Sequence, residues 1–267
     1  MFTREKRAKI LESYENKEEK ILISNILDKA FRFDKENKVI YTNFLNLHEL
    51  DLANRVLNEL KVSFSIYSPN EYCNKKVIFF IPDYIENSDQ IYNDAISCLK
   101  IIPNIKNKLI HKDYMGGIYS LGIKNEMIGD IFAYDEHAYV FCMKSVTSYL
   151  ITNLYKVGNQ EVKLEEIDLS SKEISDISVN LVKKEYIIPS LRIDAILSEV
   201  YNLSRMQTKE KILKGDLFLN DRNMFYPHVQ VKENDIVSFK KCGKMKVGKT
   251  VRKTKSDNFV IEIYKFT

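Results

Sequence analysis

The sequence predicts an α+β protein of three parts: a helical N-terminal segment, a central α/β domain, and a small C-terminal module of two helices and short strands. Three observations indicate this. Apolar residues recur at helical spacing in the first part, short apolar runs alternate with helical stripes in the middle, and basic residues gather in the last third. The chain has 267 residues, 45% of them apolar, which is enough to form cores in more than one domain.

Residues 1–73 are predicted to be mainly helical. Their apolar residues fall three and four positions apart, which places them on one face of a helix. The clearest positions are Ile21, Leu22, Ile26, Leu27 and Ala30, and then Leu50, Ala53, Val56, Leu57 and Leu60. The segment carries no identifiable chemistry, which favours a cap packed on the next domain or an arm that docks on a partner.

Residues 74–167 predict a layered domain with the order strand, helix, strand, strand, helix, strand. The first strand is the apolar run 77–81, stopped by Pro82, and 95–102 fits a second strand or a helix end. The remaining elements are helices at 111–121 and 145–155, a hairpin of 127–133 and 138–142, and an edge strand at 161–167. This order is typical of the ferredoxin-like fold, which RNA-recognition domains share with many unrelated proteins.

Aromatic side chains of this domain could stack on RNA bases, as they do on the sheets of RNA-recognition domains. The candidates are Phe79, Phe132, Tyr139 and Phe141, and core packing explains them equally well. Residues 168–180 are rich in Ser, Asp and Glu, and are predicted to be a linker.

The net charge of +4 hides an uneven distribution. Residues 1–160 carry 21 basic and 21 acidic residues, and residues 161–180 carry 2 basic and 6 acidic residues. Residues 181–267 carry 18 basic and 10 acidic residues, a balance of +8. This basic C-terminal third is the electrostatic pattern expected of a protein that binds a polyanion.

Residues 181–247 predict a compact module of two helices and small strands. The first helix covers 190–200, and Ser204 is placed to cap a second helix that ends before Gly215. Short strands follow at 217–220 and 235–239, with Asn220-Asp221 as the expected turn between them, and 248–267 is predicted as a basic C-terminal strand or tail.

Five pieces of this module resemble the S4 RNA-binding domain. They are Arg192-x-Asp194-x-x-Leu197, Ser204-Arg205, Ile212-x-x-Gly215, Phe218-Leu219-Asn220 and Val231-x-x-x-Asp235-Ile236. Each is weak alone, but their order and spacing make the resemblance specific. The module departs from the pattern in having Asp221 where a glycine usually follows the asparagine.

Motifs upstream of the module resemble the YlmH family of S4-domain proteins, which is related to the ribosome quality-control factor RqcP. They are Tyr41-Thr42-Asn43-Phe44-Leu45, His111-Lys112-Asp113-Tyr114-Met115-Gly116, Leu121-Gly122-Ile123-Lys124, Ile128-Gly129-Asp130-Ile131 and Lys156-Val157-Gly158. The resemblance covers nearly the whole chain. It implies a central RNA-recognition-like domain, a C-terminal S4 domain, and a partner that is ribosomal RNA or tRNA.

The resemblance implies a non-catalytic RNA-binding protein that associates with the large ribosomal subunit or tRNA. The expected setting is ribosome-associated quality control, or rescue of stalled large subunits that still carry peptidyl-tRNA. Two alternatives stay open: an RNA-modifying enzyme of the S4-containing pseudouridine synthase type, and a cell-division scaffold. We expect a monomer. We also expect a cytoplasmic location, because the sequence contains neither a membrane span nor an apolar signal-peptide core.

The candidate RNA-binding residues are cations of the C-terminal third. They are Arg192, Arg205, Lys209, Lys211 and Lys214 on or beside the two helices, and Lys240, Lys241, Lys244 and Lys246 in a lysine- and glycine-rich stretch predicted to be a mobile loop. His111 and Lys112 are candidates for an additional RNA contact. Solvated surface charge is the competing explanation for each of them.

No catalytic residue, metal site or cofactor is predicted. His111 and Asp113 would point about 200° apart on a helix, so they do not form an acid–base pair. Phosphate-cradling, zinc-protease and serine-hydrolase motifs are not present in the sequence. The four cysteines lack metal-ligand spacing and are expected to be buried as small apolar residues.

Overall fold

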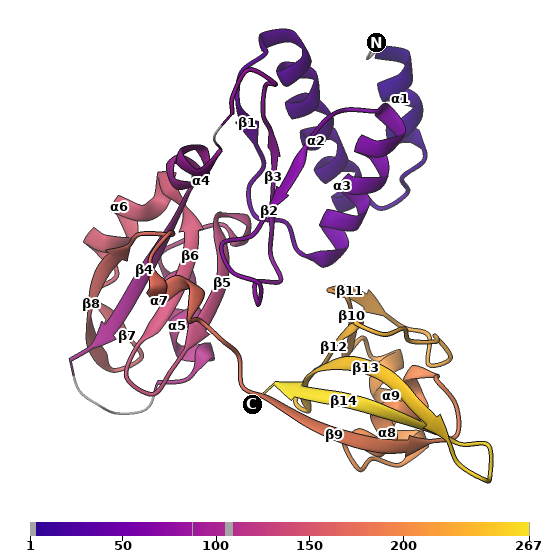
Figure 1. Cartoon of the computed structure of the whole chain (residues 1–267). Coiled ribbons are helices and arrows are strands. Elements are labelled where there is room, and N and C mark those ends of the chain that lie inside the picture. Colours follow the sequence, from indigo (N-terminus) through magenta and orange to yellow (C-terminus); the bar gives the residue numbers. More distant parts are fainter. Residues whose placement is uncertain (1–3, 87, 105–108, 267) are drawn as a thin grey trace. The chain divides into compact units, whose positions relative to one another are not determined.

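The computed structural model describes residues 4–86, 88–104 and 109–266 (Figure 1). It is a mixed structure of helices and antiparallel sheets. The chain divides into two compact units, residues 1–177 and 178–267, and each has a hydrophobic core of its own.

The first unit begins with three helices: α1 Arg4–Glu12, α2 Lys17–Glu36 and α3 Leu47–Leu60. Asn16 starts α2 by accepting hydrogen bonds from two backbone N–H groups, and Asn46 starts α3 through a capping box with Glu49. Both helices lie where the apolar stripes predict them. Their shared core contains Ile23, Ile26, Leu27, Ala30, Leu52, Ala53, Val56 and Leu57, whereas Ile21 is 53% exposed.

A three-stranded antiparallel sheet follows these helices, and it corrects the predicted first boundary. The strands are β1 Ile40–Tyr41, β2 Ser65–Tyr67 and β3 Val77–Phe80, in the order β1-β3-β2. The run predicted to open the central domain is therefore β3 of this N-terminal sheet. All four β3 residues are buried, which explains the apolar run, but the sequence does not show which sheet such a strand joins.

The second sheet of this unit has the order β5-β6-β4-β8-β7, with every pair antiparallel. Its strands are β4 Ile96–Pro103, β5 Ile128–Ala133, β6 Ala138–Met143, β7 Lys156–Val157 and β8 Gln160–Ile167. The helices are α4 Asp89–Ala95, α5 His111–Ser120, the short η1 Asn125–Met127, and α6 Lys144–Asn153. The predicted alternation of strands and helices is present, with β4 as its first strand.

One face of this sheet packs on α5 and α6, and its other face is covered as well. The aromatic residues Phe132, Tyr139 and Phe141 are at most 7% exposed. The Phe44 ring lies so close to β5 that a Cβ on Gly129 would stand 2.9 Å from it. These aromatics, and the fully buried Phe79 of the N-terminal sheet, are core residues and cannot stack on RNA bases in this structure.

The predicted linker 168–180 is largely part of the first unit. It contains the helix α7 Lys172–Ser175, in which Ile174 is 1% exposed, and Ile177 beyond it is 2% exposed. The side-chain amide of Asn70 donates hydrogen bonds to the carbonyl oxygens of both isoleucines, at 2.8 and 3.2 Å. Only residues 178–180 therefore separate this docked segment from the first strand of the second unit.

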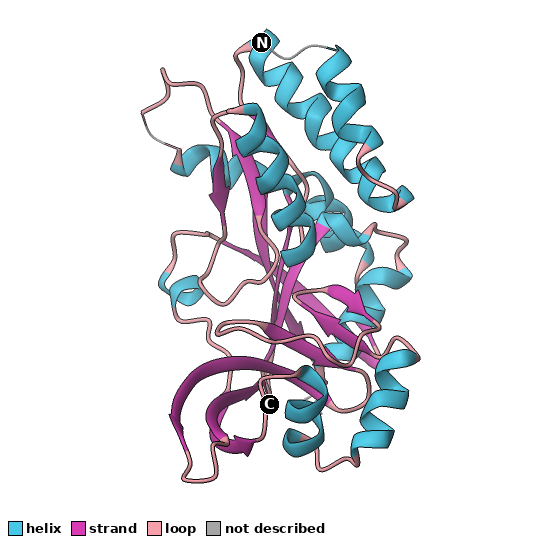
Figure 2. Cartoon of the chain, turned by 90° about the vertical axis from the view of Figure 1, so that its right-hand side faces the viewer, coloured by secondary structure: helices cyan, strands magenta, loops and turns pink. Residues whose placement is uncertain are grey.

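The second unit is a six-stranded antiparallel sheet with two helices on one face. Its elements are β9 Leu181–Ile188, α8 Ile193–Val200, α9 Arg205–Leu213, β10 Leu217–Leu219, β11 Arg222–Met224, β12 Ile236–Phe239, β13 Gly243–Lys253 and β14 Phe259–Phe266. The strand order is β11-β10-β12-β13-β14-β9. Figure 2 shows the helices on one side of strongly curved strands, and they pack there through a common core with the sheet.

Residues 248–267 are not a tail appended to the module, as far as the structure describes them. Strand β13 crosses the predicted boundary, and β14 pairs with β9 along its whole length, from Phe259 opposite Ile188 to Phe266 opposite Leu181. The first and last strands of the unit are thus hydrogen-bonded neighbours. The boundary at 247 is wrong because β13 continues through it. The pairing of β14 with β9, which is distant in the sequence, leaves no local signal.

The turn at Asn220-Asp221 joins β10 to β11, not to β12 as predicted. Both turn residues have left-handed backbone angles, φ 50° and 63°, as a two-residue hairpin turn requires. The Asn220 side chain accepts a hydrogen bond from the Ile236 backbone N–H and donates one to Asp235, each at 2.8 Å. Asp221 therefore adopts the conformation usually left to glycine, and the departure from the S4 pattern leaves the turn intact.

Candidate nucleic-acid interface

The helix pair α8–α9 forms the helical side of the second unit, and local capping fixes where α9 begins. The Ser204 hydroxyl accepts a hydrogen bond from the Gln207 backbone N–H at 3.2 Å, and the Gln207 side chain accepts one from the Ser204 N–H at 3.0 Å. Arg205 is consequently the first residue of α9, and it is exposed. The cap predicted at Ser204 is confirmed.

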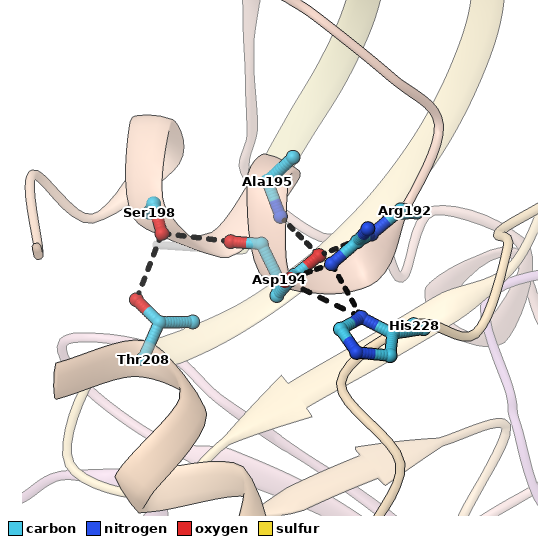
Figure 3. A network of polar contacts seen from close by, with 6 residues as sticks. All are labelled: Arg192, Asp194, Ala195, Ser198, Thr208 and His228. Carbon is cyan, nitrogen blue, oxygen red and sulfur yellow. Dashed lines mark hydrogen bonds and ion pairs between the residues drawn. The ribbon is translucent and has the colours of Figure 1, made fainter. Parts of the chain in front are cut away.

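Arg192 is engaged with a buried carboxylate at the start of α8 (Figure 3). Its guanidinium donates two hydrogen bonds to Asp194, Nε to Oδ1 at 3.1 Å and Nη2 to Oδ2 at 2.7 Å, and it also contacts Nδ1 of His228. The Asp194 side chain is 3% exposed and that of Arg192 is 39% exposed. Asp194 also accepts a hydrogen bond from the Ala195 backbone N–H at 3.0 Å.

These contacts set the ionisation of Asp194. Burial acts to raise the pKa of this carboxyl, but the hydrogen bonds and charge of Arg192, with the Ala195 N–H, outweigh burial and lower it. Arg192 thus compensates a buried negative charge. Its RNA-binding role stays a prediction: in the structure Arg192 is the partner of Asp194, with part of its surface accessible.

A second polar contact ties α8 to α9. The Ser198 hydroxyl donates to the Asp194 backbone carbonyl at 2.7 Å and lies 3.0 Å from the Thr208 hydroxyl, which is fully buried (Figure 3). The Arg192–Asp194 pair and the helix–helix junction are therefore parts of one connected network. Sequence reasoning missed His228, because it lies 36 residues from Arg192 and no local pattern marks it.

The cations of α9 differ in how far they are already paired. Lys214 forms an ion pair with Glu210 at 2.7 Å, and Lys211 lies 3.5 Å from Asp216 and over the Phe239 ring. Arg205 and Lys209 are exposed, and no ion pair is found for either among the described residues. They stand four positions apart, so they project from the same face of the helix.

The other four candidate lysines do not join this group. Lys244 and Lys246 belong to β13 and alternate with the core residues Met245 and Val247, so they point away from the helices. Lys240 and Lys241 form the turn before β13. The mobile loop predicted here is therefore wrong, and Lys244 and Lys246 lie on the face of the sheet opposite the helices.

His111 and Lys112 are exposed at the start of α5 in the first unit. The Asp113 carboxylate accepts a hydrogen bond from the Ile110 backbone N–H at 2.9 Å, which is a helix-capping contact. The Asp113 carboxylate is thus engaged at the start of its own helix.

Three of the four cysteines, Cys73, Cys98 and Cys142, are buried as predicted, and Cys242 is partly buried. Burial raises the pKa of the three buried thiols, to about 12 for Cys142. Within residues 4–86, 88–104 and 109–266, no cluster of His, Cys, Asp and Glu side chains could hold a metal ion. In the same ranges, every helix is too short or too polar to cross a membrane.

Comparison with known proteins supports an RNA-binding class. Residues 95–171 match the family model described as "Putative RNA-binding domain in YlmH". This match begins at the end of α4 and includes the start of the docked segment, which agrees with the corrected boundaries. The resemblance to the YlmH family is therefore confirmed.

Individual relatives extend this match. The chain is 21% identical over 243 residues to the ribosome-associated protein quality control protein P2 of Bacillus subtilis (strain 168), covering 91% of this chain and 93% of that protein. The structure of the cell division protein ylmH from Streptococcus pneumoniae matches with a TM-score of 0.50 and 18% identity, over 60% of this chain and 97% of that chain. The latter shows a shared fold.

A third similarity is partial. The chain is 20% identical over 221 residues to the type II beta methyltransferase M.BslI of Bacillus sp. (strain NEB-606), and this covers 80% of this chain but only 22% of the methyltransferase. The relative that matches along nearly its full length is named for ribosome-associated quality control, not for an enzymatic reaction.

Proposed function

We propose that the chain is a non-catalytic RNA-binding protein that associates with the large ribosomal subunit or with tRNA. Its proposed role is in ribosome-associated quality control, or in rescue of stalled large subunits that still carry peptidyl-tRNA. The observation that carries the proposal is the pair of exposed cations, Arg205 and Lys209, on α9 of a unit with a charge balance of +8. The full-length similarity to a ribosome-associated quality control protein supports the ribosomal partner.

The domain types in this proposal are a ferredoxin-like domain from β4 to β8 and an S4 domain over residues 181–266. The sheet order β5-β6-β4-β8, with α5 and α6 between its strands, supports the first. The capped α8–α9 pair and its motifs support the second. The protein acts as a monomer, and because ribosomes are its proposed partner, the cytoplasm is its proposed compartment.

Arg205 and Lys209 contact the backbone of structured RNA in this proposal. Arg205 stands at a helix N-terminus, where the helix dipole also favours a phosphate group, and Lys209 follows one turn later on the same face. Side chains cannot read the deep major groove of A-form RNA, so recognition proceeds through shape and backbone. Arg192 contributes mainly by holding the start of α8 in place.

The salt dependence of binding tests this mechanism. The affinity of the full chain for an RNA hairpin is expected to fall roughly 10-fold between 50 and 200 mM salt, for the two phosphates that Arg205 and Lys209 neutralise. Fluorescence anisotropy with a labelled hairpin measures it. A protein scaffold predicts binding that is insensitive to salt, and a pseudouridine synthase predicts uridine isomerisation by the pure protein on ribosomal RNA fragments. Either result contradicts the proposal.

A further inference from the structure

The sheet of the second unit has a second face, which takes no part in the RNA contact proposed for α9. Core residues Leu217, Phe239, Met245 and Val247 point toward α8 and α9. Side chains alternate along a strand, so the neighbours of these residues point to the opposite face. We call this face the outer sheet face and define it by Phe218, Lys240, Lys244, Lys246, Tyr264, Phe266 and Lys183.

The position of Lys265 confirms the direction of the last strand's side chains. Its ammonium group donates a hydrogen bond to the Val200 carbonyl at the end of α8, at 2.8 Å, so Lys265 lies on the helix side. Tyr264 and Phe266 flank it in β14 and therefore lie on the outer sheet face. Together with Phe218 of β10, they make three aromatic side chains on this face.

Each of these three rings has a lysine ammonium group above it. Lys240 lies 5.4 Å from the ring centre of Phe218, Lys244 lies 5.2 Å from that of Phe266, and Lys183 lies 5.9 Å from that of Tyr264. The three rings are partly exposed. Cross-strand pairing places them on one face: Phe218 pairs with Ser238 and Ser238 with Lys244, and Lys246 pairs with Tyr264. The Lys244 ammonium group, which lies over the Phe266 ring, links the first row to β14.

We propose that the outer sheet face binds single-stranded RNA by stacking unpaired bases on Phe218, Phe266 and Tyr264, with the adjacent lysines on the phosphates. Aromatic rings interleaved with cations are the combination that nonspecific single-strand binding uses. Paired bases in a helix do not expose their faces, so the partner is an unpaired strand. This inference rests on the proposed function, since it assigns a second surface to the same RNA-binding unit.

The expected binding energies favour the replacement of the lysine ammonium group above each ring by an RNA base. A cation–π contact at an exposed site is worth about 2-fold to 5-fold in an equilibrium constant, whereas stacking one base on an aromatic side chain is worth about 5-fold to 150-fold. Lys183 also forms an ion pair with Glu262 of β14 at 2.7 Å, so we assign the phosphate contacts to Lys240 and Lys244. Their stems are flexible, so each ammonium group can move from its ring to a neighbouring phosphate. The rings and the cations thus serve one ligand together.

The burial of the aromatic residues in the first unit supports the assignment of base stacking to the outer sheet face. Phe132, Tyr139 and Phe141, on the sheet whose topology suggests base stacking, are covered by other parts of that unit. The outer sheet face supplies partly exposed aromatics instead, and Lys244 and Lys246 add charge to it. Paired RNA on α9 and an unpaired strand on the outer sheet face would then meet opposite sides of one small sheet.

The test uses the full chain and two labelled RNAs, an unstructured 12-nucleotide strand and a blunt hairpin. The Phe218→Leu, Phe266→Leu double variant keeps apolar side chains but loses two ring faces. It is expected to bind the 12-nucleotide strand at least about 10-fold more weakly and the hairpin within about 2-fold of wild type. Tyr155→Leu, which removes a 73% exposed ring in the first unit, serves as the matched control and leaves both affinities unchanged.

Two further variants keep the test decisive if the double variant folds poorly. Phe218→Tyr with Phe266→Tyr retains both ring faces and should bind the 12-nucleotide strand like wild type. The chain contains no tryptophan, so Phe218→Trp introduces a single indole, whose fluorescence is expected to be quenched when a base stacks on it. Unquenched emission on saturation with the 12-nucleotide strand would overturn the inference.

The failure of this inference differs from the failure of the proposed function. The outer sheet face is not a stacking surface if wild type binds the hairpin but not the 12-nucleotide strand, or if the leucine variant binds both RNAs like wild type. Either result leaves the proposed RNA contact of α9 unaffected. Wild-type protein that binds neither RNA overturns both.

Discussion

The Arg205→Glu, Lys209→Glu double variant is expected to bind an RNA hairpin roughly 100-fold more weakly than wild type. Two phosphate contacts are lost, each worth about 1.5 kcal/mol, and two negative charges now repel the RNA backbone. Fluorescence anisotropy at 100 mM salt measures the change. The fold should be unaffected, since both side chains are exposed and a glutamate in the first turn of a helix suits its dipole.

A control of equal charge separates local contact from net charge. Lys17→Glu with Lys20→Glu alters two exposed lysines at the start of α2 in the first unit and shifts the net charge by the same amount. Its hairpin affinity should remain within about 3-fold of wild type, because attraction between exposed charges is screened beyond about 10 Å. If both double variants lose affinity equally, the binding depends on overall charge and α9 is not the contact.

Arg192→Leu is expected to destabilise the second unit and to lower its urea midpoint, because it leaves the buried carboxylate of Asp194 without its main partner. Urea unfolding followed by circular dichroism measures the loss. The Arg192→Leu, Asp194→Asn double variant removes the charge together with its partner and should recover most of the stability. A single variant that unfolds at the wild-type urea concentration would show that the pair is not structural.

The same pair predicts a pH dependence. The pKa of Asp194 is lowered in the folded state, so its contribution is fully present above the unfolded pKa of about 3.9 and is lost as pH falls through the folded value. Below about pH 4 the difference in stability between wild type and the double variant should therefore narrow. Because Arg192 has this structural role, a charge reversal at Arg192 is not a clean probe of RNA binding.

Elements with a local signal were predictable from the sequence, and those set by distant pairing were not. Helices α5 and α6 and the β5–β6 hairpin lie close to their predicted positions. In contrast, β3 belongs to the N-terminal sheet through pairs such as Ile40 with Phe80. The segment around Ile174 is docked through a hydrogen bond from the side-chain amide of Asn70, 104 residues away. Two isoleucines in a polar stretch do not make a periodic pattern.

The residues of the candidate site also differ in whether the sequence around them predicts their position. Arg205 follows a capping box that four neighbouring residues define, so its position at a helix N-terminus could be read locally. The lysines and glycines of 240–249 predict a loop, but Lys244, Met245, Lys246 and Val247 alternate in exposure as a strand does. That period of two was the available signal for β13. Burial of Asp194 beneath Arg192 depends on packing that no spacing shows.

Sedimentation with purified large ribosomal subunits through a sucrose gradient tests the central claim most directly. At low salt, wild-type protein is expected to travel with the subunits, and the Arg205→Glu, Lys209→Glu variant is expected to remain near the top of the gradient. Raising the salt should release the wild type as well, because phosphate contacts are weakened. Wild-type protein that stays at the top at low salt, or a double variant that sediments with the subunits as wild type does, would contradict the account.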